Sequence, residues 1–227
     1  MNPGALFVLG LIAVIAVAGI SFYLRQKRRD ELAAVAKRLG LTYSIEDTAN
    51  CLALPFALFD KGDGRGTENL LVGTWSGLAV RGFDYWYYDE STDANGNRSR
   101  SYSRFSCAVT SVDAALGALS IARENVLTRL ADSVGLDDVQ FELEDFNRAF
   151  NVKSRDPRFA NALVDQRMMR WLMTSPRDVA FETSGPWVLV WCHRVPPAEI
   201  PGLFETLKGF RDQIPRVVFD LYRGGPA

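Results

Sequence analysis

The chain has 227 residues, of which 48% are hydrophobic and 23% charged, and its formal net charge is −1. These values are typical of a folded globular protein and exclude a largely disordered chain. The near-neutral charge also argues against a nucleic-acid-binding protein, which needs a basic face. Three cysteines, an odd number with no CxxC pair, predict free buried thiols and not a disulfide framework or a zinc site: Cys51, Cys107 and Cys192.

The first predicted element is an apolar helix over residues 5–24. This segment contains no charged residue, and its length is about what a helix needs to cross the hydrocarbon core of a bilayer. A basic cluster follows directly, formed by Arg25, Lys27, Arg28 and Arg29. We therefore predict a single membrane span, with the lipid bilayer as a partner and these four cations as candidate contacts to the membrane surface.

The charge asymmetry predicts the orientation of the span. Cationic flanks stay in the cytoplasm, so we expect residues 1–4 outside the cell membrane and a domain of residues 41–227 in the cytoplasm. The alternative is a cleaved signal peptide, because Ala16-Val17-Ala18 resembles a cleavage site, and cleavage there would produce a secreted domain. The residues before the apolar run carry no positive side chain, which favours the anchor.

Residues 25–40 are predicted to continue as a basic juxtamembrane helix. Leu32, Val35 and Leu39 follow one another at helical spacing, and Gly40 is a typical C-terminal cap. We expect this segment and the apolar run to form one continuous rod that emerges from the bilayer.

Beyond residue 40 the pattern changes to short strands. Asn95-Gly96 is a strong turn signal between two of them, Gly185-Pro186 is interpreted as the turn of a second hairpin, and the glycine-rich residues 61–66 are interpreted as a loop. The predicted strands are 41–45, 69–74, 78–88, 102–110, 118–123, 139–143, 150–153, 179–183 and 187–194.

Helices are predicted between and after these strands. Asp156 and Pro157 are a helix start, with Asp as the N-cap and Pro at the first helical position. The predicted helices cover residues 125–134, 156–173 and 197–213. The fold class is therefore α+β: an N-terminal transmembrane helix followed by one mostly antiparallel sheet domain with two or three packed helices.

Few residues form a pattern that is typical of a catalytic or metal-binding site. The chain lacks a P-loop, HExxH, GxSxG and GxGxxG, and its single histidine, His193, excludes a site of several histidines. We expect no cofactor and no metal. The enzymatic alternative is a membrane-tethered hydrolase that uses Asp84, or Glu142 and Glu144, which would share one face of a strand.

The aromatic run from Phe83 to Tyr88 is the most unusual feature. Alternation places Phe83, Tyr85 and Tyr87 on one face of a strand, with Trp86 and Tyr88 on the other. Exposed aromatic side chains mark interfaces, although helices on both sides of the strand would bury them. With the cations that follow, the candidate partner-binding residues are Trp86, Tyr88, Arg98 and Arg100.

Four segments carry a resemblance to a known family. RQKRRDELAAVAKRLGL, VQFELEDFNRAFNV, DPRFA and LVDQRMMRWL resemble an uncharacterised family of bacterial membrane-anchored proteins, in which one N-terminal span precedes a cytoplasmic domain of unknown function. The resemblance covers most of the chain and implies no catalytic residue. The expected function is a non-enzymatic interaction or regulatory domain at the inner face of the membrane, with a protein partner there and no nucleic acid.

Overall fold

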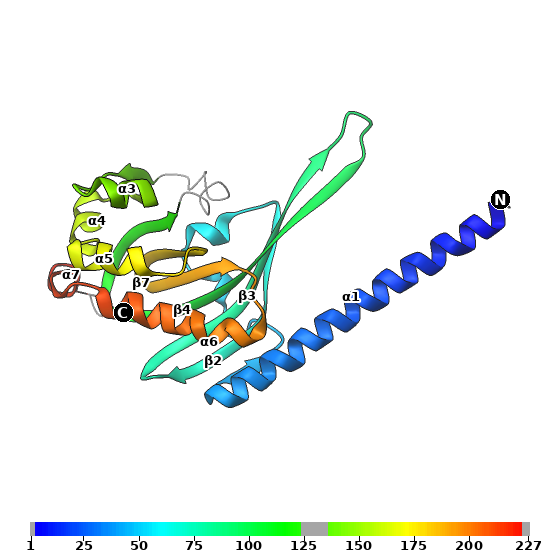
Figure 1. Cartoon of the computed structure of the whole chain (residues 1–227), viewed down its shortest axis with the longest axis horizontal. Coiled ribbons are helices and arrows are strands. Elements are labelled where there is room, and N and C mark those ends of the chain that lie inside the picture. Colours follow the sequence, from blue (N-terminus) through cyan, green and yellow to red (C-terminus); the bar gives the residue numbers. More distant parts are fainter. Residues whose placement is uncertain (1–2, 124–135, 224–227) are drawn as a thin grey trace.

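The protein consists of a long N-terminal helix and a domain built on one antiparallel sheet (Figure 1). The computed structural model describes residues 3–123 and 136–223. Helix α1 (Pro3–Leu39) is continuous, as the sequence predicted, because no residue between the apolar and basic segments interrupts its backbone hydrogen bonds. Within the described residues, α1 is the helix long and apolar enough to cross a membrane, and none of its most apolar 18-residue window is buried.

The sheet confirms the predicted α+β class. Its seven strands are β1 (Thr42–Ser44), β2 (Gly64–Trp75), β3 (Leu78–Thr92), β4 (Arg98–Arg123), β5 (Asp137–Val139), β6 (Phe150–Ser154) and β7 (Val179–His193). They run in the order β1-β2-β3-β4-β6-β5, and β7 pairs with β4 off this path. Every pair is antiparallel. The long β4 is therefore the strand that joins β3, β6 and β7 into one sheet.

Short helices cover the sheet on one face. They are α3 (Glu144–Ala149), α4 (Pro157–Leu163), α5 (Gln166–Thr174), α6 (Ile200–Gln213) and α7 (Arg216–Leu221). The larger core lies between this layer, the C-terminal end of α1 and the sheet. The smaller core lies on the opposite face, beneath the segment of residues 51–60 with its two 3-10 turns. The two faces take alternate residues of β3: Val80 faces the larger core, whereas Phe83 and Tyr85 face the smaller.

Strands β4 and β7 are longer than predicted, because they pair with each other along most of their length. The predicted hairpin around Gly185-Pro186 is wrong: both halves of β7 pair with β4, with Trp187 opposite Ser111 and Thr183 opposite Leu119. The register shifts beside Gly185, which has a positive φ of 55°, so the chain forms a bulge there instead of a turn. β4 itself runs through the gap that the sequence left between 110 and 118.

The glycine-rich segment also belongs to a strand. Gly64 lies opposite Tyr88, and Gly66 lies opposite Trp86. A Cβ atom at Gly64 would approach the Tyr88 ring to 2.4 Å, and one at Gly66 would approach the Trp86 ring to 2.8 Å. The glycines therefore provide room for two aromatic rings over β2, which explains why a segment expected to be a loop is the start of the strand.

The helical predictions need two corrections. Asp156 does cap α4, because its carboxylate accepts a hydrogen bond from the Arg158 backbone N–H at 2.9 Å. The helix does not continue to 173, however, since Asp165 caps a second helix, α5, by accepting from the Met168 N–H at 2.8 Å.

The predicted strand 139–143 is mostly wrong, because β5 ends at Val139. The predicted helix 125–134 lies outside the described residues.

Candidate functional site: an arginine-lined groove beside the long helix

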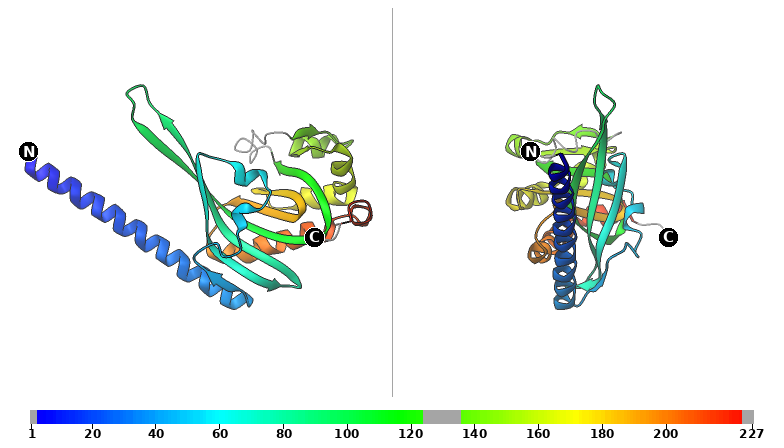
Figure 2. Two further views of the ribbon diagram at one scale, coloured as in Figure 1. Left: turned by 180° about the vertical axis from the view of Figure 1, so that it is seen from behind. Right: turned by 90° about the vertical axis from the view of Figure 1, so that its right-hand side faces the viewer.

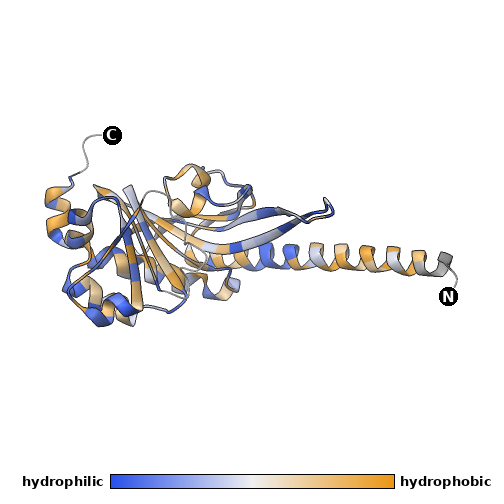
Figure 3. Ribbon diagram, turned by 90° about the horizontal axis from the view of Figure 1, so that it is seen from above, coloured by the Kyte–Doolittle hydropathy of each residue, from blue (hydrophilic) through white to orange (hydrophobic). Residues whose placement is uncertain are grey.

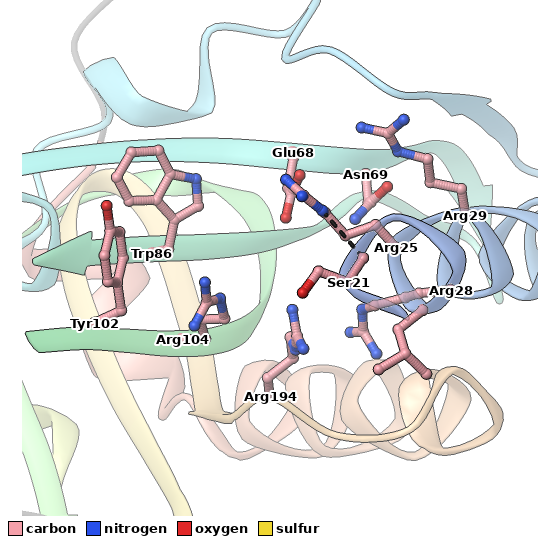
Figure 4. Close-up of a pocket in the computed structure, with 11 residues that line it drawn as sticks. Ser21, Arg25, Arg28, Arg29, Glu68, Asn69, Trp86, Tyr102, Arg104 and Arg194 are labelled. Carbon is pink, nitrogen blue, oxygen red and sulfur yellow. Dashed lines mark hydrogen bonds between the residues drawn. The ribbon is translucent and has the colours of Figure 1, made fainter. Parts of the chain in front are cut away.

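A groove of about 570 Å³ separates the middle of α1 from the sheet (Figure 4). Its walls come from α1, β2, β3, β4 and the segment after β7, so that five stretches of sequence meet there. The lining residues are Ser21, Leu24, Arg25, Arg28, Arg29, Glu68, Asn69, Trp86, Tyr102, Arg104 and Arg194. The groove lies at the point where the apolar part of α1 gives way to its basic part, and we take it as the candidate site.

A buried ion pair forms the floor of the groove. The Nε and Nη2 atoms of Arg28 both donate to the carboxylate of Asp84, each at 2.7 Å, and Nη1 donates to the Val195 carbonyl at 2.8 Å. The side chains of Arg28 and Asp84 are 13% and 4% exposed. Arg28, predicted to contact the membrane surface, is thus turned into the domain and fastens α1 to the sheet.

Asn69 completes this floor from a strained position. Its φ of +59° lies at the β-bulge between Glu68 and Leu71, a conformation that Asn tolerates better than most residues. The side-chain amide donates to Asp84 at 2.9 Å and accepts from the Tyr43 hydroxyl at 2.8 Å. The bulge therefore turns Asn69 inward so that Asp84 is held from two sides.

The remaining cations of the groove are not neutralised in this way. Within residues 3–123 and 136–223, the guanidinium groups of Arg29, Arg104 and Arg194 form no ion pair with a carboxylate, and Arg25 donates to the Ser21 carbonyl at 3.3 Å. Burial, together with the like charges of Arg28 and Arg104, lowers the pKa of Arg194. Glu68 is the acidic side chain on the lining, so the groove carries an excess of positive charge.

An aromatic wall closes one end of the groove. The rings of Trp86 and Tyr102 lie 6.0 Å apart, and Tyr88 packs on Tyr102 at 5.4 Å. The Arg104 guanidinium lies 5.2 Å from the Tyr102 ring and that of Arg100 4.5 Å from the Tyr88 ring, both within the range of a cation–π contact.

The two faces of the aromatic run differ in burial. Phe83, Tyr85 and Tyr87 are buried in the smaller core, whereas Trp86 and Tyr88 remain half-exposed on the groove side. Trp86 lines the groove together with residues of α1. Farther along the hairpin, Arg98 and Arg100 are exposed and both pair with Glu90, at 3.3 and 3.0 Å.

The residues of the hydrolase alternative are not brought together. Asp84 is held by Arg28, as described above. Glu142 and Glu144 do not share a strand face, because Glu144 begins α3 and pairs with Arg148 at 2.9 Å. Across the described ranges, no group of three or more His, Cys, Asp and Glu side chains is placed to hold a metal ion.

Sequence reasoning found part of the groove. It named Arg25, Arg28, Arg29 and Trp86, whereas Lys27 lies outside the lining and pairs with Glu31 at 3.9 Å. It missed Arg194, Asn69 and Glu68, because their segments meet only in the folded sheet. Asn69 does carry a signal, since a turn-forming residue within an apolar strand pattern indicates a bulge.

The fold and the groove define an α+β domain carried on a long apolar helix, and one solved structure shares this fold. No family model and no curated protein matches the chain. The crystal structure of the mycobacterial trehalose monomycolate transport factor A, TtfA, is similar over 88% of this chain and 98% of that chain, with a TM-score of 0.60 and 15% identity. At this identity the likeness shows a common fold alone, and the resemblance to a bacterial membrane-anchored family stays a prediction.

Proposed function

We propose that the protein is a membrane-anchored, non-enzymatic interaction domain. In this proposal residues 5–24 cross the cell membrane, residues 1–4 lie outside, and residues 41–227 form a domain at the cytoplasmic face. The apolar window of α1, with a mean hydropathy of 2.5, and the cations on its C-terminal side support this orientation. The hairpin formed by the ends of β3 and β4 contacts a protein partner at the membrane.

One observation carries this proposal: the hairpin projects from the sheet on the same side of the domain as α1. Figures 1 and 2 show both leaving the same side of the domain in similar directions and diverging toward their ends, and Figure 3 shows that the hairpin is polar where the helix is apolar. Trp86 and Tyr102 line the same groove as Ser21 and Leu24. From Trp86, β3 continues to Thr92, which adds roughly 20 Å at the usual rise of a strand.

The hairpin therefore extends past the level at which the apolar part of α1 begins. Lipid tails solvate neither exposed strand edges nor charged groups, which persist at membrane depth only beside protein or water. The exposed polar end of the hairpin includes Asp89, Asp93, Arg98 and Arg100. A protein neighbour in the membrane accommodates such a surface, whereas bare lipid does not. TtfA is described as a transport factor, and an accessory role in transport suits a domain with this geometry.

Site-specific crosslinking of the full chain in native membranes tests the proposal. A photoreactive residue in place of Ser99, near the hairpin tip, is expected to capture a discrete partner. The matched control is Ser76, an exposed turn residue at the opposite end of β3, which should capture none. Trp86→Ser combined with Tyr88→Ser should reduce capture at least about tenfold, the loss expected when interface aromatics are removed.

Three results would overturn the proposal. Equal yields from positions 99 and 76 would show that the hairpin is not a docking surface. Unfolding of the Trp86→Ser/Tyr88→Ser variant would show that the two rings belong to the core. A mature protein whose N-terminus begins after Ala18 would establish the secreted alternative, and N-terminal sequencing detects it.

A further inference from the structure

We propose that the arginine-lined groove binds the phosphate of an acidic phospholipid, with an acyl chain lying along the face of α1 above it. This inference rests on α1 lying in a bilayer, as proposed above, but it concerns a site and a ligand different from the protein partner of the hairpin.

The phosphate end of the site is built by three separate elements. Figure 4 shows Arg25 on α1, Arg104 on β4 and Arg194 after β7 with their side chains directed into the same hollow. Because Asp84 already neutralises Arg28, the other arginines present charge without a protein counter-ion apart from Glu68. Guanidinium groups match the oxygens of a phosphate through paired N–H donors, so a phosphate is the anion that suits this arrangement.

The position of the groove along α1 favours a lipid as the source of that phosphate. Trp86 and Tyr102 form one end of the hollow, and such side chains gather at the headgroup level of membranes. Ser21 and Leu24, in the last helical turn of the apolar segment, form another wall. The cations thus lie where lipid phosphates lie if α1 spans the bilayer.

An apolar furrow continues from the groove along the same helix face. Ala13, Val14, Val17 and Ala18 line a shallow hollow of about 400 Å³ on α1. Residues three and four apart share a helix face, which places Val14, Val17 and Ala18 in line with Ser21 and Arg25. These apolar side chains form a contact surface for the acyl chain of a lipid whose phosphate lies in the groove. A free phosphate compound has no acyl chain that could occupy this furrow.

Native mass spectrometry of the purified full-length protein in a neutral detergent tests the inference. With phosphatidylglycerol and phosphatidylcholine added in equal amounts, the protein should retain phosphatidylglycerol preferentially. Arg104→Gln with Arg194→Gln should reduce this preference roughly tenfold or more, given the worth of each cation near an anionic lipid. The matched control is Arg98→Gln with Arg100→Gln, two exposed arginines outside the groove, which should leave the preference unchanged.

A second pair of variants tests the furrow separately from the charges. Ala18→Phe fills the furrow and should lower the retention of phosphatidylglycerol. Ala16→Phe makes the same change two positions away, on roughly the opposite side of the helix, and should have little effect. Both substitutions are on the exposed part of α1, so neither disturbs the core of the domain.

Four results would overturn the inference: equal retention of the two lipids by the wild-type protein, equal loss with either arginine pair, equal effects of Ala18→Phe and Ala16→Phe, or full displacement of phosphatidylglycerol by an equal concentration of glycerol phosphate. The last would assign the groove to a free phosphate compound. Because the measurement uses purified protein without a partner, failure of hairpin crosslinking would not produce any of these results.

Discussion

At the scale of single residues, the pair of Arg28 and Asp84 determines how the helix meets the sheet. Both side chains are largely buried, and each oxygen of Asp84 accepts one hydrogen bond from Arg28. Taking two charges out of water costs free energy that their attraction only roughly offsets. The pair therefore adds little net stability over an apolar pair, but removal of one partner leaves an unpaired buried charge.

Asp84→Ala should lower the free energy of unfolding by about 3 kcal/mol, because Arg28 is then buried without a counter-ion. Denaturant unfolding of the full chain in detergent measures the change. The double variant Arg28→Met with Asp84→Leu should recover most of the loss, since it removes both charges. A loss below about 1 kcal/mol for Asp84→Ala would show that water reaches the pair.

Glu182 gives the protein a pH-dependent stability. Burial raises the pKa of Glu182 to about 7, although the Leu58 and Ala57 backbone N–H groups and the Trp191 indole act in the opposite direction. The folded state thus keeps a proton up to about pH 7, whereas the unfolded chain releases it near the ordinary value of 4.5. The stabilisation is complete below pH 4.5 and is lost as the pH rises to about 7.

Replacement of Glu182 by Gln removes this titration. The stability of Glu182→Gln relative to the wild-type protein should therefore rise by roughly 2 to 3 kcal/mol between pH 5 and pH 8, measured by denaturant unfolding at each pH. Glu144→Gln, an exposed carboxylate, is the control and should leave the pH dependence as it is. If the relative stability of Glu182→Gln stays constant with pH, Glu182 does not titrate in this range.

At the scale of elements, close contacts decide where the helices lie on the sheet. Helix α6 packs tightly on β3 at Gly82, where a Cβ atom would lie 2.6 Å from the buried ring of Phe204. The Phe204 ring also packs on Trp75, with centroids 5.8 Å apart. Gly82 therefore sets the distance between α6 and the sheet.

Gly82→Ala should destabilise the protein by about 1 to 3 kcal/mol, the usual cost of overpacking a core. Gly202→Ala is the matched control in α6, because open space surrounds that position, and it should stabilise the helix by up to about 1 kcal/mol. Thermal unfolding of both variants separates the two effects. An unchanged melting temperature for Gly82→Ala would show that α6 moves freely over the sheet.

The sequence predicted elements well where one element contains its own signal. The alternation in residues 78–88 correctly separated the buried Tyr85 from the half-exposed Trp86, and the cap at Asp156 correctly began α4. The sequence-based predictions failed where the structure of a segment depends on the strand with which it pairs. Gly185-Pro186 has the composition of a turn, but the long edge of β4 holds the residues on both sides of it in one strand. The groove was missed as a unit for the same reason, because Arg194 reaches it from the far end of the chain.

At the scale of the whole molecule, α1 is a rigid connection and not a flexible tether. The helix is unbroken from Pro3 to Leu39, its last turns are buried against the sheet through Leu32, Val35 and Ala36, and Arg28 fixes it to Asp84. Any rotation of the apolar segment about its own axis must therefore rotate the domain as well.

One alanine inserted after Ile20 should turn residues 7–20 by about 100° relative to the domain, because a helix has 3.6 residues per turn. The furrow then faces away from the groove, and the preference for phosphatidylglycerol should fall in native mass spectrometry. The thermal unfolding of the domain should not change, since residues 21–39 keep their contacts. A variant that unfolds earlier, or one that keeps the preference, would contradict this arrangement.

The fixed attachment of α1 also bears on how often an encounter with a partner succeeds. A domain on a slack linker tumbles above the bilayer, and it must give up that orientational entropy whenever it docks. In this protein, the Arg28–Asp84 contact fixes the orientation of the domain relative to α1 during folding, so this entropy is not lost again on docking. Two molecules that meet by lateral diffusion then need to match only one rotation, about the membrane normal. Weak contacts along a narrow hairpin can suffice for recognition under that condition.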